Sequence, residues 1–281
     1  MMNIAVIGAG TMGRGIALTA IQQGASVALH DISEDSLKKA KSYIQTQLQK
    51  GLEKGYISNT EVIQEESKVV YSTNLDCVVK HADLVIEAVI EEMDAKVRIF
   101  KELDRLAPIN AILATNTSTM SPTEIGAQTK RPDKVVAMHF FNPVHKMKLI
   151  EIVRALDTSN ETVEMARKAG EFLGKTTVEV NESPGFITSR MNCLIGNEAM
   201  NMLREGVASV EDIDNAIKLG LNHPMGPLEM ADLVGLDSRL RNMEYLHETL
   251  GEKYRPSPLL RKYVKAGRLG RKTGVGFYHY S

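Results

Sequence analysis

A glycine-rich turn between an apolar strand and a helix constrains the fold of this chain more than any other feature. The strand-like run Ile4–Ile7 leads into the pattern G-x-G-x-x-G, and a stretch with helical spacing follows. The first glycine permits a tight turn, the second lets a pyrophosphate approach the backbone, and the third lets the helix pack closely on the sheet. The helix N-terminus presents unpaired N–H groups to the phosphates. The residues predicted to bind a dinucleotide here are Gly8, Gly10, Thr11, Met12 and Gly13.

A carboxylate stands where the second strand of such a unit ends. Asp31 closes the run Ser26–His30, 18 residues after Gly13. At this position a carboxylate accepts hydrogen bonds from the adenosine ribose, and its charge repels a 2′-phosphate, which favours NAD over NADP. Lys38 or Lys39 keeps open the alternative that the site accommodates the 2′-phosphate of NADP. FAD is disfavoured, because a large flavin usually brings further segments and the 281 residues contain no tryptophan.

Strand-like and helical segments alternate through the first two-thirds of the chain. The strand-like runs are rich in Val and Ile, as expected for parallel strands that are covered on both faces. They occupy Asn3–Ile7, Ser26–His30, Val69–Ser72, Leu84–Ala88, Ile112–Thr115, Val135–His139, Leu149–Val153 and Thr176–Val180. This alternation predicts an α/β fold with a Rossmann-type doubly wound sheet.

The pattern changes after Ser183-Pro184-Gly185 and becomes almost entirely helical. The longest helical segment, Ile187–Glu205, places its apolar side chains on one face. We therefore predict two domains. Residues 1–183 form an NAD-binding Rossmann-type domain, and residues 184–281 form a smaller all-helical domain.

The composition excludes several classes of partner. Lys and Arg total 34 and Asp and Glu total 35, so no global positive charge favours nucleic acid or an acidic membrane. No apolar run approaches the roughly 20 residues that span a bilayer, and we expect no targeting segment. Cys77 and Cys193 are too few for a disulfide framework or a structural zinc site. We expect a cytoplasmic protein without a metal.

A histidine and a glutamate are the candidate acid–base pair. His139 ends the sixth strand, where ligands bind in open α/β sheets, and an imidazole exchanges protons near neutral pH. Glu151 lies within the next apolar strand, where an unpaired charge is costly, so His139 is its best partner. The alternatives are a core histidine bound to a backbone carbonyl and an edge-strand glutamate that faces water. His145 is the second candidate base, although its setting suggests a loop.

Asn116-Thr117-Ser118 follows the fifth strand and adds two polar candidates. Ser118 is placed to donate a hydrogen bond to a substrate oxygen, and Asn116 to contact the nicotinamide ribose. By composition alone an ordinary turn is the better explanation of these residues, because Asn, Ser and Thr are common in turns.

Taken together, the motifs resemble those of the 3-hydroxyacyl-CoA dehydrogenase family over nearly the whole chain. Within that family the chain most resembles the small bacterial 3-hydroxybutyryl-CoA dehydrogenases. The matching segments, in the family's order, are Gly8–Gly13, Asn116–Ser118, His139-Phe140-Phe141-Asn142-Pro143, Ser183-Pro184-Gly185-Phe186, His223–Leu228, Gly235-Leu236-Asp237 and Gly270–Tyr278. The resemblance implies NAD-dependent interconversion of an L-3-hydroxyacyl-CoA, here short-chain 3-hydroxybutyryl-CoA, and a 3-oxoacyl-CoA in fatty-acid metabolism. It also implies a homodimer that associates through the helical domain.

The resemblance assigns roles to individual residues. His139 is the acid–base, Glu151 its partner, and Ser118 a substrate contact. Lys54 occupies the position of a family lysine that approaches the CoA phosphates. The positions near the cofactor are Asp31, Glu91, Lys96, Asn142 and Lys272.

One departure from the family pattern concerns the substrate carbonyl. Ser189 stands where the family commonly has an asparagine after the Pro-Gly-Phe motif. Asn192 lies three residues further on the same helix face, so we expect Ser189 or Asn192 to take over the contact. Two alternative functions remain at this point: a related dehydrogenase of a free hydroxy acid or sugar acid, and a non-catalytic NAD-binding protein.

Overall fold

An eight-stranded sheet forms the centre of the first part of the chain, in the strand order β3-β2-β1-β4-β5-β6-β7-β8. The strands are β1 Asn3–Ile7, β2 Ser26–His30, β3 Val69–Ser72, β4 Leu84–Glu87, β5 Ile112–Thr115, β6 Val135–Phe140, β7 Leu149–Arg154 and β8 Thr176–Asn181. Strands β1 to β6 are parallel, β7 is antiparallel to β6, and β8 is parallel to β7. Strands β7 and β8 therefore run opposite to the other six and are the exceptions to the predicted parallel sheet.

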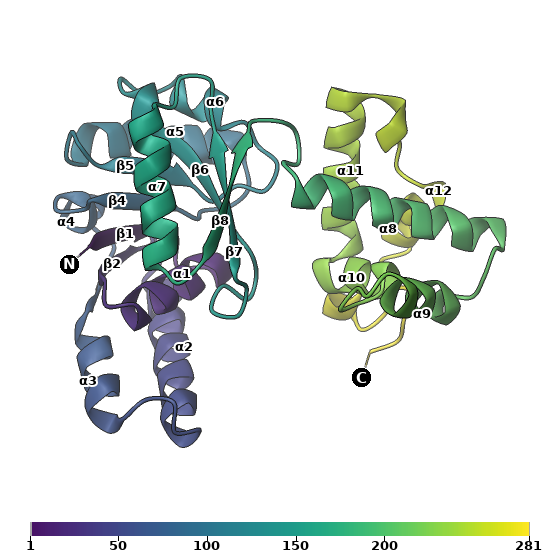
Figure 1. Ribbon diagram of the computed structural model, residues 1–281, viewed down its shortest axis with the longest axis horizontal. Coiled ribbons are helices and arrows are strands. Elements are labelled where there is room, and N and C mark those ends of the chain that lie inside the picture. The colour runs from purple at the N-terminus through teal and green to yellow at the C-terminus, as the bar shows by residue number, and fades with distance from the viewer. Residues whose placement is uncertain (1, 281) are drawn as a thin grey trace. The chain divides into compact units, whose positions relative to one another are not determined.

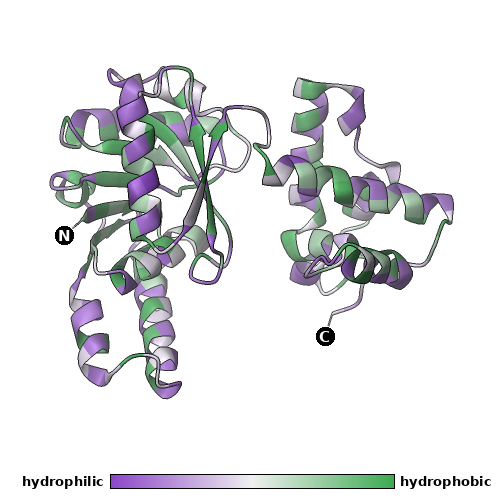
Figure 2. Ribbon diagram, in the orientation of Figure 1, coloured by the Kyte–Doolittle hydropathy of each residue, from purple (hydrophilic) through white to green (hydrophobic). Residues whose placement is uncertain are grey.

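Helices cover both faces of this sheet (Figure 1). They are α1 Thr11–Gln22, α2 Glu34–Glu53, α3 Asn59–Ser67, α4 Leu75–Val79, α5 Met93–Leu106, α6 Pro122–Gly126 and α7 Asn160–Phe172. One buried cluster joins Ile4 and Val6 of β1 to α1, α2 and α7, and a second joins Ala5 and Ile7 to α4, α5 and α6. Figure 2 shows the result, with largely hydrophobic central strands and helices of mixed hydropathy.

The short helix α3 is the one helix of this region that the apolar pattern does not predict. Only Val62 and Glu65 of its nine residues are buried, so it carries almost no hydrophobic periodicity. Its start is nevertheless marked by a capping box, in which Ser58 accepts from the backbone of Glu61 and the Glu61 side chain accepts from the backbone of Ser58. That local signal, rather than periodicity, identifies the helix.

The structure, a computed structural model, describes residues 2–280 and separates into two compact units at the bond between Glu182 and Ser183. The second unit is helical, with α8 Thr188–Glu205, α9 Val210–Gly220, α10 Pro227–Val234, α11 Leu236–Leu250 and α12 Pro258–Lys265 around its own apolar core. The predicted fold class, a doubly wound α/β sheet followed by helices, is confirmed. Within residues 2–280 no helix combines the length and apolar character that a membrane span requires.

Candidate active site

Most predicted site residues of the first unit gather at the carboxyl edge of its parallel strands. The glycine-rich turn follows β1, Asp31 follows β2, Glu91 follows β4 and Ser118 follows β5, while His139 lies near the end of β6. Parallel strands end at the same edge, so four loops and the end of β6, all distant in sequence, contribute to one region. The Oδ1 of Asn116 accepts a hydrogen bond from the backbone N of Phe140 at 2.9 Å, which ties the loop after β5 to the end of β6.

His139 and Glu151 form a buried pair across two adjacent strands. Because β7 runs antiparallel to β6, the two residues stand directly opposite each other in register. The His139 Nδ1 lies 2.7 Å from the Glu151 Oε2, and the residues are 7% and 0% exposed. Strand β7 is flanked by β6 and β8, so Glu151 is neither an edge residue nor turned to water. The predicted contact between these two side chains is present.

The pairing fixes the chemistry of each imidazole nitrogen. The Glu151 carboxylate accepts the Nδ1–H, so in the neutral ring Nε2 is the basic nitrogen. Nε2 is thus the ring nitrogen that can take up a further proton. His145, the second candidate base, lies in the loop between β6 and β7, and its pKa is lowered by burial and by the charges of Lys146 and Lys175. No described carboxylate is hydrogen-bonded to His145, in contrast to His139.

The glycine-rich turn has the geometry that a dinucleotide requires. Gly8 has a φ of +104°, and a Cβ on Gly13 would lie 1.7 Å from the carbonyl oxygen of Gly8. A Cβ on Gly10, in contrast, would have no described atom within 4 Å. Asp31 is held by backbone donors, Ala9 N to Oδ2 at 2.8 Å and Ser33 N to Oδ1 at 2.9 Å.

These features fit an NAD pyrophosphate and ribose. Gly10 is the N-cap of helix α1, and no described side chain caps its first turn, whereas α2, α4, α6 and α7 are each capped by a Ser or Asn side chain. The uncapped amide groups of α1 and its dipole suit a diphosphate. Asp31, which is fixed by its backbone donors, would then accept from the ribose hydroxyls.

Two glycine substitutions separate the roles of this turn. We expect Gly10→Ala to keep the fold, because its φ is −67° and its Cβ position is open, but to raise the NAD Kd about tenfold or more by obstructing a charge-assisted backbone contact. Gly13→Ala forces backbone atoms apart and we expect it to lower stability by about 1–3 kcal/mol as well. Thermal unfolding and calorimetric NAD titration measure both effects. Equal losses of stability in the two variants would contradict this distinction.

A second ionic cluster lies where β4 ends. Lys96 Nζ contacts Glu87 Oε1 at 2.8 Å and Glu91 Oε2 at 3.1 Å, and Glu87 and Lys96 are both 0% exposed. Glu91 Oε1 in turn accepts from Thr117 Oγ1 at 2.5 Å and from the backbone N of Ser118 at 2.9 Å. The cluster thus joins the predicted cofactor residues Glu91 and Lys96 to the predicted substrate contact Ser118.

Glu87 was not anticipated from the sequence. Besides Lys96, it accepts from Thr115 Oγ1 at 2.6 Å and from the backbone N of Val89 at 2.8 Å. The signal was the same one that identified Glu151, a lone carboxylate in an apolar strand, here Leu84–Glu87. Such a group needs a buried partner, and Lys96 supplies it.

The remaining predicted site residues lie apart from these clusters or in the other unit. Asn142 is exposed and precedes Pro143 through a cis peptide bond. Lys54 is exposed at the C-terminus of α2, in the α2–α3 pair that extends beyond the sheet (Figure 1). Ser189 and Asn192 are half-buried in the first two turns of α8, and Lys272 forms an ion pair with Asp237 within the helical unit.

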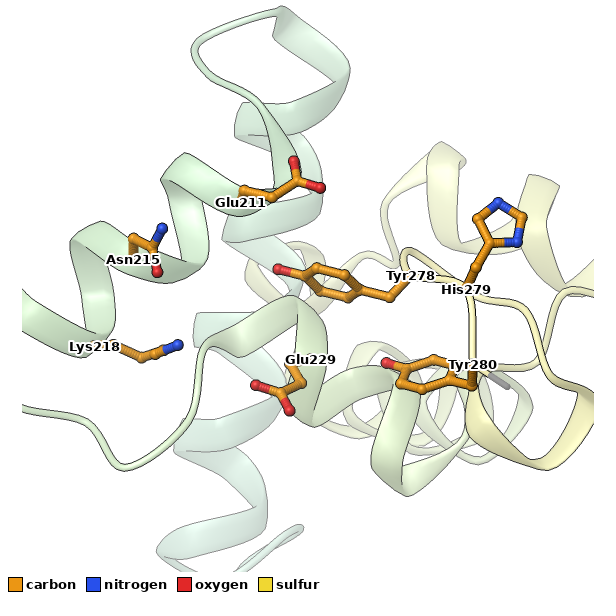
Figure 3. A pocket seen from close by; sticks show the side chains of 7 residues that line it. All are labelled: Glu211, Asn215, Lys218, Glu229, Tyr278, His279 and Tyr280. Carbon is orange, nitrogen blue, oxygen red and sulfur yellow. The ribbon is translucent and has the colours of Figure 1, made fainter.

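The helical unit carries a hollow of about 360 Å³ that involves none of the predicted site residues (Figure 3). Tyr278 and Tyr280 line it, and their hydroxyls donate to the buried carboxylates Asp214 and Asp232. Burial and the bond to Asp232 raise the pKa of Tyr280 to about 12, so it stays protonated as a donor. These contacts anchor the end of the chain to α9 and α10, which is a structural role.

Comparison with known proteins decides what this site belongs to. Residues 3–183 match the family model of the 3-hydroxyacyl-CoA dehydrogenase NAD-binding domain, and residues 185–280 match that of the C-terminal domain of the same family. The chain belongs to the 3-hydroxyacyl-CoA dehydrogenase family. As the sequence predicted, it is an NAD-linked oxidoreductase of that family.

Individual members of the 3-hydroxyacyl-CoA dehydrogenase family are similar over their full length. A Bacillus subtilis protein described as a probable 3-hydroxybutyryl-CoA dehydrogenase is 50% identical over 99% of this chain and 97% of its own. A 3-hydroxybutyryl-CoA dehydrogenase of Clostridioides difficile is 45% identical over 100% of both chains. The crystal structure of (S)-3-hydroxybutyryl-CoA dehydrogenase from Ralstonia eutropha superimposes with a TM-score of 0.97 and 42% identity, covering 100% of this chain and 99% of that one.

Proposed function

We propose that this protein interconverts L-3-hydroxybutyryl-CoA, the S enantiomer, and acetoacetyl-CoA with NAD, and that His139 and Glu151 form its acid–base pair. The observation that carries the proposal is the 2.7 Å contact between the His139 Nδ1 and the Glu151 Oε2 at the carboxyl edge of the sheet. The substrate class rests on the family and on the names of the relatives. The acid–base role rests on the buried pair, which a protein that only binds NAD does not need.

Each residue of the site has a separate role in the proposed reaction. Bound NAD supplies the hydride acceptor in oxidation, and NADH the hydride donor in reduction. In oxidation His139 Nε2 takes the proton of the 3-hydroxyl as the hydride leaves the same carbon, and Glu151 stabilises the imidazolium that results. In reduction the imidazolium returns that proton to the alkoxide oxygen. Ser118 would hold the substrate oxygen by a hydrogen bond, Asn116 would contact the nicotinamide ribose, and Asn142 would lie near the cofactor.

Replacing the partner carboxylate tests the pair itself. We expect Glu151→Gln to keep the fold and to lower kcat about 10- to 100-fold, the value of one charge-assisted hydrogen bond. The pH dependence of the rate should shift to lower pH, because an uncharged amide no longer favours the imidazolium. Steady-state kinetics across pH measure both. A variant with wild-type kcat and an unchanged pH profile would remove Glu151 from this role.

The direct assay is NADH oxidation with acetoacetyl-CoA. We expect turnover with acetoacetyl-CoA and NADH, little with NADPH, and little with free acetoacetate. A longer 3-oxoacyl-CoA measures the chain-length preference. Activity with free acids but not with acyl-CoA would favour a dehydrogenase of hydroxy or sugar acids. NADH binding without any turnover would favour a non-catalytic protein.

We further propose that residues 1–183 bind NAD and that residues 184–281 supply substrate contacts and the surface of a homodimer. Ser189 or Asn192 would contact the substrate, Lys54 the CoA phosphates, and Lys272 the cofactor. Support for self-association comes from exposed apolar side chains of the helical unit, among them Ile187 at 50% and Met191 at 53%. Light scattering tests the dimer, since a mass of 31.0 kDa at assay concentration would contradict it. The free thiols of Cys77 and Cys193 support a cytoplasmic location.

A further inference from the structure

The ion cluster at the end of β4 contains one more negative than positive charge. Lys96 Nζ lies 2.8 Å from Glu87 Oε1 and 3.1 Å from Glu91 Oε2, so one ammonium group serves two carboxylates. Glu87 and Lys96 are completely buried, and the two Glu87 oxygens also accept from Val89 N and Thr115 Oγ1. These donors, together with Lys96, give both oxygens of the buried Glu87 side chain hydrogen-bond partners. The Lys96 ammonium group therefore lies in the protein interior, where it pairs with Glu87.

Glu91 carries the excess negative charge of this cluster of Glu87, Glu91 and Lys96. Its side chain is 38% exposed, unlike that of Glu87. Burial alone would raise the pKa of Glu91, but Lys96 and the hydrogen bonds from Thr117 and Ser118 outweigh burial and lower it. Glu91 is therefore a carboxylate at neutral pH. Because Glu87 already compensates Lys96, the positive charge of Lys96 does not cancel that of Glu91.

This excess charge faces the nicotinamide half of the dinucleotide site. Asp31 after β2 marks the adenosine ribose, and the start of α1 after β1 marks the pyrophosphate. The other half of the dinucleotide must therefore lie over the ends of β4, β5 and β6, where Glu91, Ser118 and His139 stand. The Ser118 backbone N donates to Glu91 at 2.9 Å, so Glu91 is part of the same loop surface.

We propose that Glu91 makes the site distinguish the oxidised from the reduced cofactor. Oxidised nicotinamide is a cation and reduced nicotinamide is neutral, so a nearby uncompensated carboxylate stabilises bound NAD⁺ and leaves bound NADH nearly unaffected. Glu87 is the positioning residue of this device, because it neutralises Lys96 and so preserves the charge of Glu91. The ionisable pair of His139 and Glu151 and the carboxylate of Asp31 also lie at this end of the sheet, and they remain unchanged in the variants below.

Binding of the two cofactor forms tests the proposal without a substrate. We expect Glu91→Gln to raise the Kd of NAD⁺ about tenfold while the Kd of NADH stays within about twofold, because only the oxidised ring carries the positive charge that the carboxylate attracts. Isothermal titration with NAD⁺ and NADH measures both. Glu91→Asp retains the charge and should retain the wild-type ratio. Glu92→Gln removes an exposed neighbouring charge and should leave the ratio unchanged.

Glu87→Gln provides an independent variant if Glu91→Gln does not fold. It leaves Glu91 in place but makes the cluster neutral overall, so it should reduce the preference for NAD⁺ in the same direction. The proposal is overturned if the variants weaken NAD⁺ and NADH equally, or if the ratio stays at the wild-type value. The inference rests on the proposed function only in taking NAD as the cofactor. A negative result here would leave acetoacetyl-CoA reduction intact, and failure of that reaction would leave this binding test valid.

Discussion

His139→Gln lowers kcat by about 100- to 10,000-fold, the range that general acid–base catalysis contributes. The glutamine amide has a shape similar to imidazole and can still donate to Glu151, so the sheet and the pair of strands should remain intact. It cannot take up and return a proton near neutral pH. We therefore expect NADH to bind with near wild-type affinity while turnover of acetoacetyl-CoA is lost. Stopped-flow or steady-state NADH oxidation, with a parallel NADH titration, measures this.

His145→Gln is the matched control for that variant. His145 lies in the loop that follows His139, but burial, Lys146 and Lys175 lower its pKa, and no described carboxylate is hydrogen-bonded to it. We expect its kcat to stay within about twofold of wild type, as for substitutions outside a site. A large loss in His145→Gln together with near-normal turnover in His139→Gln would transfer the acid–base role to the loop.

Lys96→Met destabilises the first unit by about 3–5 kcal/mol, because it leaves the carboxylate of Glu87 buried without a counter-charge. Methionine retains most of the apolar stem, so the loss reports the missing ammonium group rather than a cavity. Thr115 Oγ1 and Val89 N still donate to Glu87, but neither carries a positive charge. Urea unfolding followed by circular dichroism measures the change in the free energy of unfolding.

Two further variants make the stability result specific. Lys101→Met removes an exposed lysine from the same helix and should change stability by less than about 0.5 kcal/mol. The double variant Glu87→Gln/Lys96→Met removes both charges and should recover most of the loss, since replacing a whole buried pair is far less costly than breaking it. If Lys96→Met is as stable as Lys101→Met, the buried ion pair does not support this fold.

The order of elements could be predicted because the chain marks it locally. Apolar runs without alternation indicate buried parallel strands, and the glycine pattern and Asp31 locate the cofactor edge. Helix α3 does not follow from periodicity because only Val62 and Glu65 are buried in it, and its one local sign is the capping box at Ser58. Glu87 was missed although it follows the same reasoning as Glu151. Its partner Lys96 comes from the next helix, which no strand pattern reveals.

The strand pattern alone does not predict the direction of β7, on which the geometry of the site depends. The connection between Phe140 and Leu149 is only eight residues long, too short for the crossover that a parallel neighbour requires. That length indicates an antiparallel pair, and the antiparallel register is what sets Glu151 opposite His139. The contact was expected from the cost of an unpaired buried charge, whereas its geometry depends on tertiary pairing of strands.

The pH dependence of both reaction directions tests the central claim most directly. If His139 exchanges the proton, kcat/KM for acetoacetyl-CoA reduction is highest at low pH and falls as the imidazolium loses its proton. For 3-hydroxybutyryl-CoA oxidation kcat/KM rises with pH and then levels off, and both profiles bend at the same pH. The account predicts that this shared bend disappears in His139→Gln. A residual rate that keeps the same bend in His139→Gln would show that another group exchanges the proton.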